Sequence, residues 1–471
     1  MTDHDSHQFD STTLREYDIR GIVGETLGEA DARAIGRGFA TLLTRAGGKR
    51  VAVGYDGRTS SPVLEAALIE GLTVSGCDVV RIGMGPTPML YYAEASAEDV
   101  DGGIQITGSH NPANYNGFKM VFQGRPFFGD DIQEIGRLAA GGDWTTGSGT
   151  TQSREVLDEY VERIAEGLDG IDTARLSGLR VGWDNGNGAA GPALEKLAAK
   201  LPGEHHLLYT EVDGNFPNHH PDPTVEANLE DLRQLVADKG LDFGIAFDGD
   251  GDRIGAIDGE GRVIWGDQLL MIYARDLLVR IPNATIIADV KASRALFDTV
   301  AELGGKPVMW KTGHSLIKSK MKETGSPLAG EMSGHVFFAD TYYGYDDALY
   351  AGVRLMAASA RLGKSVTQLR GEMPAMVNTP ELRFQVDESR KFAAIDEVKA
   401  RLANSTDDVD GTDGVRVTGK DGWWLLRASN TQDVLVARAE SDSEEGLARL
   451  VAKIDEQLQL SGLERGPQAG H

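Results

Sequence analysis

Residues 50–56 read RVAVGYD, and residues 59–62 read TSSP. The first stretch is rich in β-branched residues and predicts a buried strand, and the hydroxyl side chains followed by a proline predict the capped start of a helix. Gly76 and Asp78 then precede a second apolar run at residues 79–82. A strand, an aspartate, small residues, a helix, a glycine and another strand together make up one α/β unit.

The same order of features occurs twice more in the chain. The second copy starts with LRVGWD at residues 179–184, and the third starts with TIIAD at residues 285–289. We interpret the three copies as a diverged internal repeat of α/β domains. In each copy a later apolar run leads into a polar, glycine-containing loop, and these runs are residues 102–106, 243–247 and 327–329. Ligands of open α/β sheets collect at the carboxyl ends of the strands, so the three loops are expected to face one central cleft.

The last part of the chain has a different pattern. Residues 381–386 and 434–439 alternate like strands, and they flank a helix predicted from about residue 389 to residue 402. The predicted fold is therefore three similar α/β domains with mixed sheets, followed by a C-terminal α+β domain, around the cleft. The tail from residue 462 to residue 471 is expected to be disordered. The predicted domains are residues 1–154, 155–260, 261–374 and 375–471.

Charge and composition limit the functions that the chain can have. Its 471 residues include 72 Asp and Glu against 47 Lys and Arg, which gives a net charge of −25. Such a surface argues against non-specific nucleic-acid binding and against docking on anionic membranes, so an anionic substrate needs a local basic pocket. Cys77 is the only cysteine, which excludes an internal disulfide and a cysteine-rich metal site. The polar N-terminus is no signal peptide, no apolar stretch reaches the length of a membrane span, and a cytoplasmic location is expected.

The loop of the first copy reads TGSHNP at residues 107–112 and continues to Lys119. Glycine, serine, asparagine and proline are frequent in any loop, so an ordinary turn is one interpretation. However, Ser109 lies in a glycine-loosened turn with His110 beside it and Lys119 ten positions on. A hydroxyl needs activation by its neighbours to react, and this cationic, imidazole-bearing setting suits a serine that accepts and returns a phosphoryl group.

The loop of the second copy reads DGDGDR at residues 248–253. Three carboxylates at alternate positions, separated by glycines, can face one point, where a hard divalent cation would neutralise them. An EF-hand is excluded, because that loop needs glycine at its sixth position and an acid at its twelfth, and here these are Arg253 and Gly259. With only three carboxylates, the remaining ligands would be water or a substrate phosphate, which suits Mg²⁺; a solvated acidic turn is the alternative.

Three further stretches carry weaker signals. The third loop reads GEMSGH at residues 330–335, and its carboxylate and hydroxyl could hydrogen-bond to sugar hydroxyls. The turn RASNT at residues 427–431 offers an arginine fork, two hydroxyls and free N–H groups, which suit a phosphate, although an ordinary turn is about equally consistent with it. The turn YDIRG at residues 17–21 could aim Arg20 into a cleft or leave it exposed. Lys291 and His314 could likewise serve the site or face solvent.

Together these stretches resemble the α-D-phosphohexomutase superfamily, most closely its bacterial phosphomannomutase/phosphoglucomutase branch. The resemblance runs from Tyr17 to Asn430 with the motifs in the same order, and its most specific parts are residues 107–112, 248–253, 330–335 and 427–431. It implies a four-domain, heart-shaped enzyme with a central cleft. One departure is Asp433, because the family's last phosphate loop often has proline two residues after its threonine.

The resemblance also implies a role for each candidate residue. Ser109 would be the phosphoserine, and an oxygen on it would bind one Mg²⁺ together with Asp248, Asp250 and Asp252. The residues expected at the reacting centre are Ser109, Lys119, Arg20, His110, Arg253, His314 and His335. The residues expected to bind substrate are Tyr17, Lys291, Glu331, Ser333, Arg427, Ser429, Asn430 and Thr431.

The implied activity interconverts hexose 1-phosphate and hexose 6-phosphate, of mannose, glucose or both, through a hexose 1,6-bisphosphate intermediate. Sugar phosphates are then the only partners expected, and no protein partner is evident from the sequence. Three alternatives stay open: a phosphoglucosamine mutase, a metal-dependent sugar phosphatase, and an inactive sugar-phosphate-binding protein. The wording of the third loop, GEMSGH at residues 330–335, looks more like the mannose/glucose type than the glucosamine type.

Overall fold

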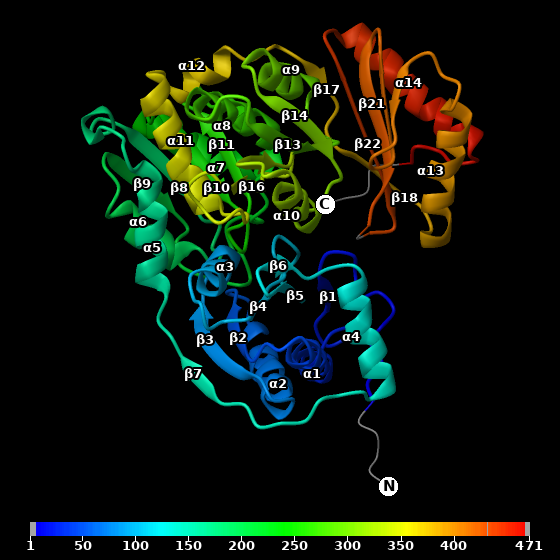
Figure 1. Cartoon of the computed structure of the whole chain (residues 1–471). Helices are drawn as coiled ribbons and strands as arrows, with labels where there is room; N and C mark the ends of the chain where they lie inside the picture. The colour runs from blue at the N-terminus through cyan, green and yellow to red at the C-terminus, as the bar shows by residue number, and fades with distance from the viewer. Residues whose placement is uncertain (1–5, 431, 467–471) are drawn as a thin grey trace.

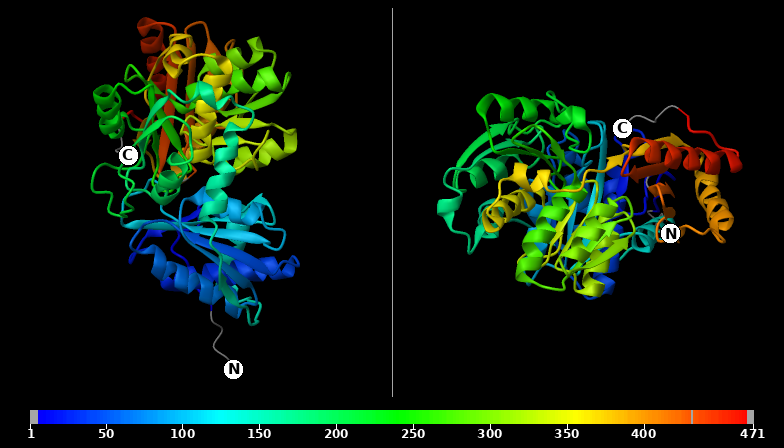
Figure 2. Two further views of the ribbon diagram at one scale, coloured as in Figure 1. Left: turned by 90° about the vertical axis from the view of Figure 1, so that its left-hand side faces the viewer. Right: turned by 90° about the horizontal axis from the view of Figure 1, so that it is seen from above.

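The computed structural model describes residues 6–430 and 432–466. Their strands form four separate sheets that follow one another along the chain. Figure 1 shows the first sheet in a lower lobe, the second and third sheets above it, and the fourth sheet at the upper right. The side view in Figure 2 shows the same division between the lower lobe and the rest. The predicted fold class of three α/β domains followed by an α+β domain is confirmed.

The first domain contains a seven-stranded sheet. Its elements are β1 (Ile19–Ile22), α1 (Glu29–Arg45), β2 (Arg50–Tyr55), α2 (Ser61–Val74), β3 (Asp78–Met84), α3 (Thr87–Ala95), β4 (Gly102–Ile106), β5 (Tyr115–Phe122), β6 (Arg125–Pro126), α4 (Asp130–Gly141) and β7 (Thr151–Ser153). The capping prediction for α2 was wrong, because Ser60 forms no side-chain cap bond. The hydroxyls of Ser60 and Ser61 instead accept hydrogen bonds from Nδ2 of Asn116, at 2.8 and 3.0 Å.

The second and third domains are smaller. The second contains α5 (Leu157–Ala165), η1 (Glu166–Leu168), η2 (Thr173–Arg175), β8 (Arg180–Asp184), α6 (Gly191–Ala198), β9 (Glu204–Leu208), η3 (Glu226–Leu229), α7 (Glu230–Lys239), β10 (Phe243–Phe247), β11 (Ile254–Asp258) and β12 (Val263–Ile264). The third contains α8 (Gly266–Arg280), β13 (Thr285–Asp289), α9 (Arg294–Glu302), β14 (Lys306–Trp310), α10 (His314–Thr324), β15 (Leu328–Gly330), β16 (Val336–Phe338), α11 (Ala348–Leu362) and α12 (Val366–Gly371).

The three α/β domains share one topology. Their central strands run in the order β5-β4-β2-β3, β11-β10-β8-β9 and β16-β15-β13-β14. Within each set the first pair is an antiparallel hairpin, and the other two pairs are parallel. The polar loop of each copy is therefore the hairpin turn that follows the carboxyl end of a buried parallel strand. This equivalence explains how three loops far apart in the sequence present chemistry in the same way.

The fourth domain contains a six-stranded sheet. Its elements are β17 (Val377–Asn378), β18 (Leu382–Gln385), α13 (Glu388–Leu402), β19 (Asp408–Asp410), β20 (Val415–Gly419), β21 (Gly422–Ala428), β22 (Val434–Ser441) and α14 (Glu444–Leu460). The predicted strands and helix of this region correspond to β18, β22 and α13. Of the tail predicted to be disordered, residues 462–466 carry no helix or strand, and residues 467–471 lie outside the described part of the chain. None of the helices that the structure describes is long and apolar enough to cross a membrane.

The domains differ in how they are joined. One hydrophobic cluster runs from α3 of the first domain through Trp183 of the second to Leu355 of the third, so these three share a continuous core. The fourth domain has its own core around Trp424. Its apolar contact with the third domain is small, with Trp423 packed on Val290. Polar contacts add to it, because Nη1 of Arg416 donates to the carbonyls of Val290 and Ala292, and Lys291 pairs with Glu381. The fourth domain therefore has a core of its own and is held to the third domain largely by polar contacts.

A buried carboxyl group links the second domain to the third. Oδ2 of Asp347 accepts hydrogen bonds from the hydroxyls of Tyr160 and Tyr342, at 3.0 and 2.8 Å, and Oδ1 accepts one from the backbone N–H of Tyr350. Burial raises the pKa of Asp347 to about 7 although these hydrogen bonds oppose the shift. In the unfolded chain the same pKa lies near 3.9, so between these values the folded chain binds the extra proton.

Stability should therefore fall as the pH rises from about 4 to about 7 through this group. Asp347→Asn keeps an acceptor for the helix cap but cannot ionise. Relative to the wild type, the variant is expected to gain free energy of unfolding, on the order of a few kcal/mol, between pH 4 and pH 8. Urea unfolding at several pH values measures this difference. A constant difference across the range would contradict the prediction.

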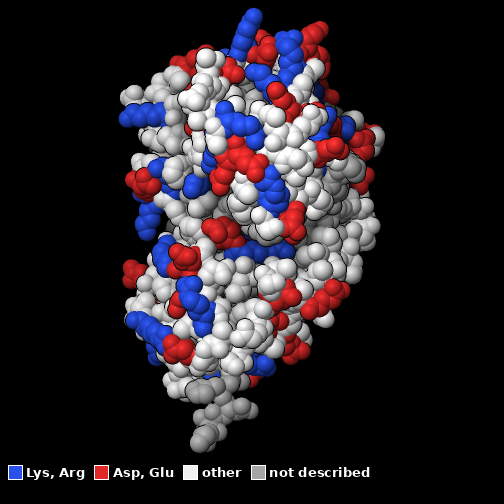
Figure 3. Space-filling model, turned by 90° about the vertical axis from the view of Figure 1, so that its right-hand side faces the viewer, with Lys and Arg blue, Asp and Glu red and all other residues white. Residues whose placement is uncertain are grey.

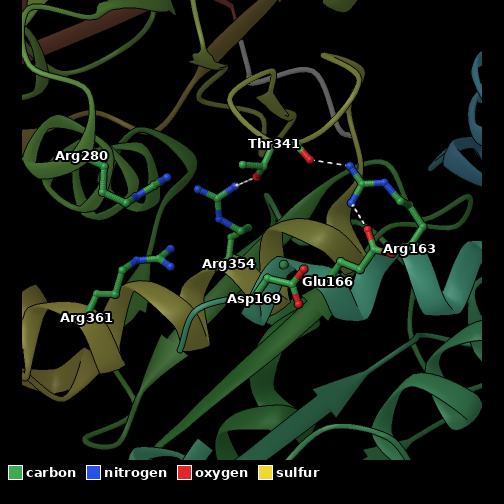
Figure 4. Close-up of a pocket in the computed structure, with 8 residues that line it drawn as sticks. Arg163, Glu166, Asp169, Arg280, Thr341, Arg354 and Arg361 are labelled. Atoms are coloured by element: carbon green, nitrogen blue, oxygen red, sulfur yellow. Dashed lines mark hydrogen bonds and ion pairs between the residues drawn. The ribbon is translucent and has the colours of Figure 1, made fainter. Parts of the chain in front are cut away.

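A cavity of about 170 Å³ lies near this link, between α5, α8 and α11. Figure 4 shows that four arginine side chains point into it, together with Glu166 and Asp169. Carboxylates pair with all four: Arg280 and Arg354 with Asp340, Arg361 with Asp276, and Arg163 with Glu166. Because the charges compensate, we interpret this cluster as an ion-pair network between the domains rather than as an anion site.

Candidate active site

A cavity of about 610 Å³ opens between all four domains. Figure 3 shows Lys and Arg side chains in the hollow between the lower lobe and the parts above it, on a surface that otherwise carries mixed charge. Fourteen of the predicted site residues line the cavity: Tyr17, Arg20, Ser109, His110, Lys119, Arg253, Lys291, His314, Glu331, Ser333, His335, Arg427, Ser429 and Asn430. Thr431, the remaining predicted substrate ligand, lies outside the described residues.

Ser109 lies in the β4–β5 hairpin turn and has φ near 50°, which is unusual for a residue with a side chain. Oγ of Ser109 donates a hydrogen bond to Oδ2 of Asp248 at 2.9 Å. Nδ1 of His110 lies 3.2 Å from Oγ of Ser109. Burial, with the nearby cation of Arg253, holds the pKa of His110 well below its usual range. The hydroxyl therefore lies between a carboxylate and a neutral imidazole.

The three aspartates of the β10–β11 turn lie beneath Ser109. All three are fully buried, and their carboxylate oxygens come within 4.8 Å of one another. Burial, together with the carboxylates of Asp250 and Asp252, holds the pKa of Asp248 well above its usual range. Among the described residues, Oδ1 of Asp250 and Oδ1 of Asp252 have no hydrogen-bond partner. Oδ1 of Asp252 does lie 3.3 Å from Nε2 of His335, whereas Oδ1 of Asp250 has no charged partner among the described residues. A buried, unpartnered carboxylate oxygen beside two further carboxylates fits a divalent cation with oxygen ligands.

Neighbouring domains hold this acidic turn in place. The backbone N–H of Thr87, at the start of α3, donates to the carbonyl of Asp250 at 2.8 Å. Gly249 has no room for a side chain, since a Cβ there would lie 2.5 Å from the carbonyl oxygen of Ser109. An isolated β-bridge joins Arg253 to His335. The serine loop, the acidic loop and the third loop therefore meet backbone to backbone.

Lys119 brings a cation to the same point. Its ammonium group donates to Oδ2 of Asp250 at 2.7 Å and also contacts Asp252. Burial by itself would lower the pKa of Lys119, but the carboxylates of Asp250 and Asp252 outweigh it and raise the pKa. Lys119 is therefore charged and lies in the acidic cluster that Ser109 contacts through Asp248.

The third loop places one histidine between two acids. Nδ1 of His335 lies 2.9 Å from Glu331, and Nε2 lies 3.3 Å from Asp252. Burial disfavours the charged ring, but Asp252 and Glu331 outweigh it and raise the pKa of His335 to about 9. Oγ of Ser333 lies 3.2 Å from Nδ1 of the same ring. In contrast, burial and the ammonium of Lys318 hold the pKa of His314 well below its usual range.

The fourth domain closes the cavity from the opposite side. Nε of Arg427 donates to Oδ2 of Asp413 at 3.0 Å, and the same oxygen accepts the backbone N–H of Thr312 in the third domain. Nδ2 of Asn430 donates to the hydroxyl of Tyr17 at 2.5 Å, and that hydroxyl donates to the carbonyl of Thr312. This chain of hydrogen bonds joins the first, third and fourth domains around the cavity.

Models of all four domains of one protein family match the chain. The "Phosphoglucomutase/phosphomannomutase, alpha/beta/alpha domain" I, II and III models match residues 11–145, 158–261 and 265–376, and the C-terminal domain model matches residues 381–457. The chain belongs to the phosphoglucomutase/phosphomannomutase family. The resemblance seen in the sequence motifs is thereby confirmed.

Individual members of the family match over nearly their full length. A phosphomannomutase/phosphoglucomutase of Pseudomonas aeruginosa is 44% identical over 448 residues, which covers 95% of this chain and 96% of that protein. A phosphoglucomutase of Neisseria gonorrhoeae is 41% identical, covering 93% of this chain and 94% of its own. A crystal structure of a phosphoglucomutase/phosphomannomutase family protein from Burkholderia thailandensis has a TM-score of 0.90 and 44% identity, and the match covers 97% of this chain and 98% of that chain.

Asp433, where the family's loop often has proline, does not reach the cavity. Its side chain is 64% exposed, and its carboxylate lies 3.9 Å from the ammonium of the buried Lys391. The backbone carbonyl of Asp433 accepts the N–H of Val386, which joins the turn to β18. The substitution therefore adds no negative charge inside the predicted phosphate site.

Sequence reasoning missed several residues around the site. Arg58 is buried beneath the Ser109 loop, Asp346 lies between Lys318 and the two histidines of the third domain, and Arg15 lines the cavity. A signal for Arg58 was present: it stands two residues after the aspartate that ends a repeat strand, as Lys291 stands two residues after Asp289. No local pattern marks Asp346 or Arg15.

Proposed function

We propose that this chain is a phosphohexomutase that interconverts hexose 1-phosphate and hexose 6-phosphate, of mannose, glucose or both. A phosphoryl group on Ser109 would pass to the free hydroxyl of a hexose monophosphate, forming a hexose 1,6-bisphosphate. The observation that carries this proposal is the position of Ser109, whose Oγ lies 2.9 Å from a carboxylate of the acidic cluster at the floor of a four-domain cavity. Family membership supports the same reaction class.

The acidic cluster supports a metal as cofactor, and we propose that this is one Mg²⁺ per chain. It would be held by Asp248, Asp250, Asp252 and an oxygen on Ser109, and it would neutralise charge on the transferred phosphoryl group. Oδ1 of Asp250, which has no partner among the described residues, is the donor that fits it best. Of the three buried carboxylates, Asp250 and Asp252 pair with Lys119 and Asp252 also pairs with His335, and a divalent cation would complete the compensation of the cluster.

The residues at the reacting centre would each have a role in phosphoryl transfer. In the first transfer the bond from Oγ of Ser109 to phosphorus would break and a bond from the sugar oxygen to phosphorus would form. The sugar hydroxyl would lose its proton, and the freed Oγ of Ser109 would end with one, so that the serine hydroxyl is restored. Lys119 and Arg253 would stabilise the charge that develops on the phosphoryl oxygens, with Arg20, His110, His314 and His335 completing the wall of the reacting centre. The bisphosphate then turns in the cavity, and its other phosphoryl group returns to Ser109.

Substrate binding would use the third and fourth domains. Glu331 and Ser333 would accept and donate hydrogen bonds to the sugar hydroxyls, while Tyr17 and Lys291 would border the sugar and its phosphate. The distal phosphate would bind at the turn after β21, where the proposed ligands are Arg427, Ser429, Asn430 and Thr431. One distal site then serves both orientations of the bisphosphate.

Assays with three purified substrates test this function. Mannose 1-phosphate, glucose 1-phosphate and glucosamine 1-phosphate are supplied with a catalytic amount of glucose 1,6-bisphosphate, and the 6-phosphates are measured by coupled enzymes. Turnover of mannose or glucose phosphate supports the proposal. Preference for the glucosamine phosphate would identify a phosphoglucosamine mutase, release of inorganic phosphate would identify a phosphatase, and binding without turnover would identify an inactive binding protein.

We further propose that the fourth domain is a mobile clamp, joined to the rest near Pro374. Its separate core and the largely polar character of its contacts with the third domain support this motion. Closure would keep the bisphosphate in the cavity while it turns. The predicted domain limits of 1–154, 155–260, 261–374 and 375–471, and the cytoplasmic location, belong to the same proposal.

Arg427→Ala tests the clamp. The substitution should raise KM for sugar phosphate and increase release of the bisphosphate, while Ser109 stays phosphorylated. Loss of one charge-assisted contact costs roughly 1.5–3 kcal/mol, or about one to two decades in kcat/KM. Arg390→Ala is the control, because Arg390 is on α13 of the same domain and pairs with Glu397 away from the cavity. Wild-type KM and wild-type leakage in Arg427→Ala would refute the clamp.

A further inference from the structure

One arginine near the site binds backbone rather than substrate. The side chain of Arg58, in the turn between β2 and α2, is fully buried, and it does not line the cavity. Its position lies on the far side of the Ser109 loop from the bound sugar that we propose. A guanidinium has five N–H donors in a rigid plane, so a buried one needs five acceptors.

Arg58 has all five. Nε donates to Oδ2 of Asp56 at 3.1 Å. The four N–H groups of Nη1 and Nη2 donate to four backbone carbonyls of the serine loop, which are those of Pro112 (2.5 Å), Tyr115 (3.0 Å), Ser109 (2.8 Å) and Asn111 (2.6 Å). One rigid plane therefore spans the whole turn from Ser109 to Tyr115. The backbone N–H of Gly108 adds a bond to the same carboxylate of Asp56, at 3.1 Å.

The second domain holds this arginine from the other side. The guanidinium carbon of Arg58 lies 5.3 Å from the ring centroid of Phe216, in the loop after β9, which is the range of a cation–π contact. Phe216 itself has φ near 51°, a left-handed conformation that is costly for an aromatic residue. Gly214 has no room for a side chain, because a Cβ there would lie 2.5 Å from Cα of Arg58.

The serine loop packs tightly around the guanidinium of Arg58. A Cβ at Gly108 would lie 2.4 Å from the guanidinium carbon of Arg58, so only glycine fits there. Ser109 has φ near 50°, an unfavourable conformation for a serine that surrounding contacts must maintain. The carbonyl of Ser109 is one of the four that Arg58 binds. The arginine therefore acts on the backbone unit that carries the nucleophile.

We propose that Arg58 is the positioning residue of the nucleophile: it holds Ser109 in its left-handed conformation against Asp248, and Phe216 of the second domain holds Arg58. This inference rests on the proposed role of Ser109. The nucleophile is on the first domain and the acidic cluster is on the second. A change in how these two domains pack should therefore alter the rate of phosphoryl transfer directly. The buried guanidinium of Arg58 also binds the backbone carbonyl of Ser109, so its positive charge lies close to the proposed phosphoserine.

Arg58→Lys separates geometry from charge, since lysine keeps the charge but has three donors on a single nitrogen and cannot span the turn. Misplacement of a reacting group by about 1 Å costs on the order of 100-fold, so kcat should fall by about 100-fold. KM for glucose 1-phosphate should change by no more than about threefold, because Glu331 and Ser333, the proposed ligands of the sugar hydroxyls, are on the third domain. Phosphorylation of dephosphorylated Ser109 by glucose 1,6-bisphosphate, followed by intact-protein mass spectrometry in single turnover, should slow by the same factor as kcat.

Two further variants complete the test. Phe216→Leu leaves Arg58 and all its hydrogen bonds in place but removes the ring that covers it, and about a tenfold fall in kcat with unchanged KM is expected. Arg354→Lys is the matched control, because Arg354 is equally buried and carboxylate-bound but belongs to the ion-pair network of Figure 4, remote from the site. It should lower the melting temperature and leave kcat within about twofold of wild type.

The outcomes separate this inference from the proposed function. Wild-type kcat and a wild-type phosphorylation rate in Arg58→Lys would overturn the inference, and so would an equal loss of kcat in Arg354→Lys, which would mark a general loss of stability. If the wild-type chain itself never acquires phosphate on Ser109 from the bisphosphate, the proposed function fails before Arg58 is tested.

Discussion

Ser109→Ala is expected to abolish mutase activity, with a loss of about 10⁴-fold or more in kcat. The hydroxyl of Ser109 contacts a carboxylate of the acidic cluster at 2.9 Å and the imidazole of His110 at 3.2 Å. Removal of its oxygen leaves no atom to carry the phosphoryl group between the two half-reactions. Intact-protein and peptide mass spectrometry should find phosphate on Ser109 in the wild type and none in the variant.

Ser60→Ala is the control for this prediction. The hydroxyl of Ser60 accepts a hydrogen bond from Asn116 behind the same loop and does not line the cavity. This variant should retain both the phosphate and the activity. Full activity in Ser109→Ala, or phosphate located on another residue, would show that the nucleophile has been assigned wrongly.

Removal of the divalent metal is expected to have an effect of similar size, roughly 10³-fold or more in kcat, restored by added Mg²⁺. The physical reason is electrostatic, because burial and mutual repulsion already hold the pKa of Asp248 well above its usual range. A phosphoserine would add further negative charge next to it. Lys119 pairs with Asp250 and Asp252, and His335 pairs with Asp252, so removal of the metal should take from the cluster a charge that these two cations do not replace at Asp248.

Asp250→Asn provides a readout apart from activity. Metal content and Mg²⁺ affinity, measured by calorimetry, should fall sharply, because Oδ1 of Asp250 is a buried oxygen of the cluster with no partner among the described residues. Asp258→Asn is the matched control: Asp258 is equally buried, but it is at the far end of β11 and bonds to Arg262. Activity that is unaffected by EDTA, or unchanged Mg²⁺ affinity in Asp250→Asn, would argue for a solvated acidic turn.

The fold could be predicted because each of its units is encoded locally. Runs such as residues 50–56 and 285–289 are short, β-branched and followed by an aspartate and a helix start, so strand and helix follow from nearest neighbours in the sequence. The capping prediction at Ser60 failed for the opposite reason. Its hydroxyl bonds to Asn116, more than fifty residues away, and a competing tertiary partner cannot be read from a local capping pattern.

The sequence by itself indicated which loops meet at the cavity, because the three carboxylates, the serine and the turn after β21 are each contiguous motifs at strand ends. Only the tertiary structure showed which residues hold these loops in position. Arg58 binds carbonyls that look like those of any other loop, and Phe216 reaches it from another domain. Backbone carbonyls carry no side-chain signature, and contacts between domains depend on packing over long sequence separations. A positioning residue is therefore visible only once the domains have been assembled.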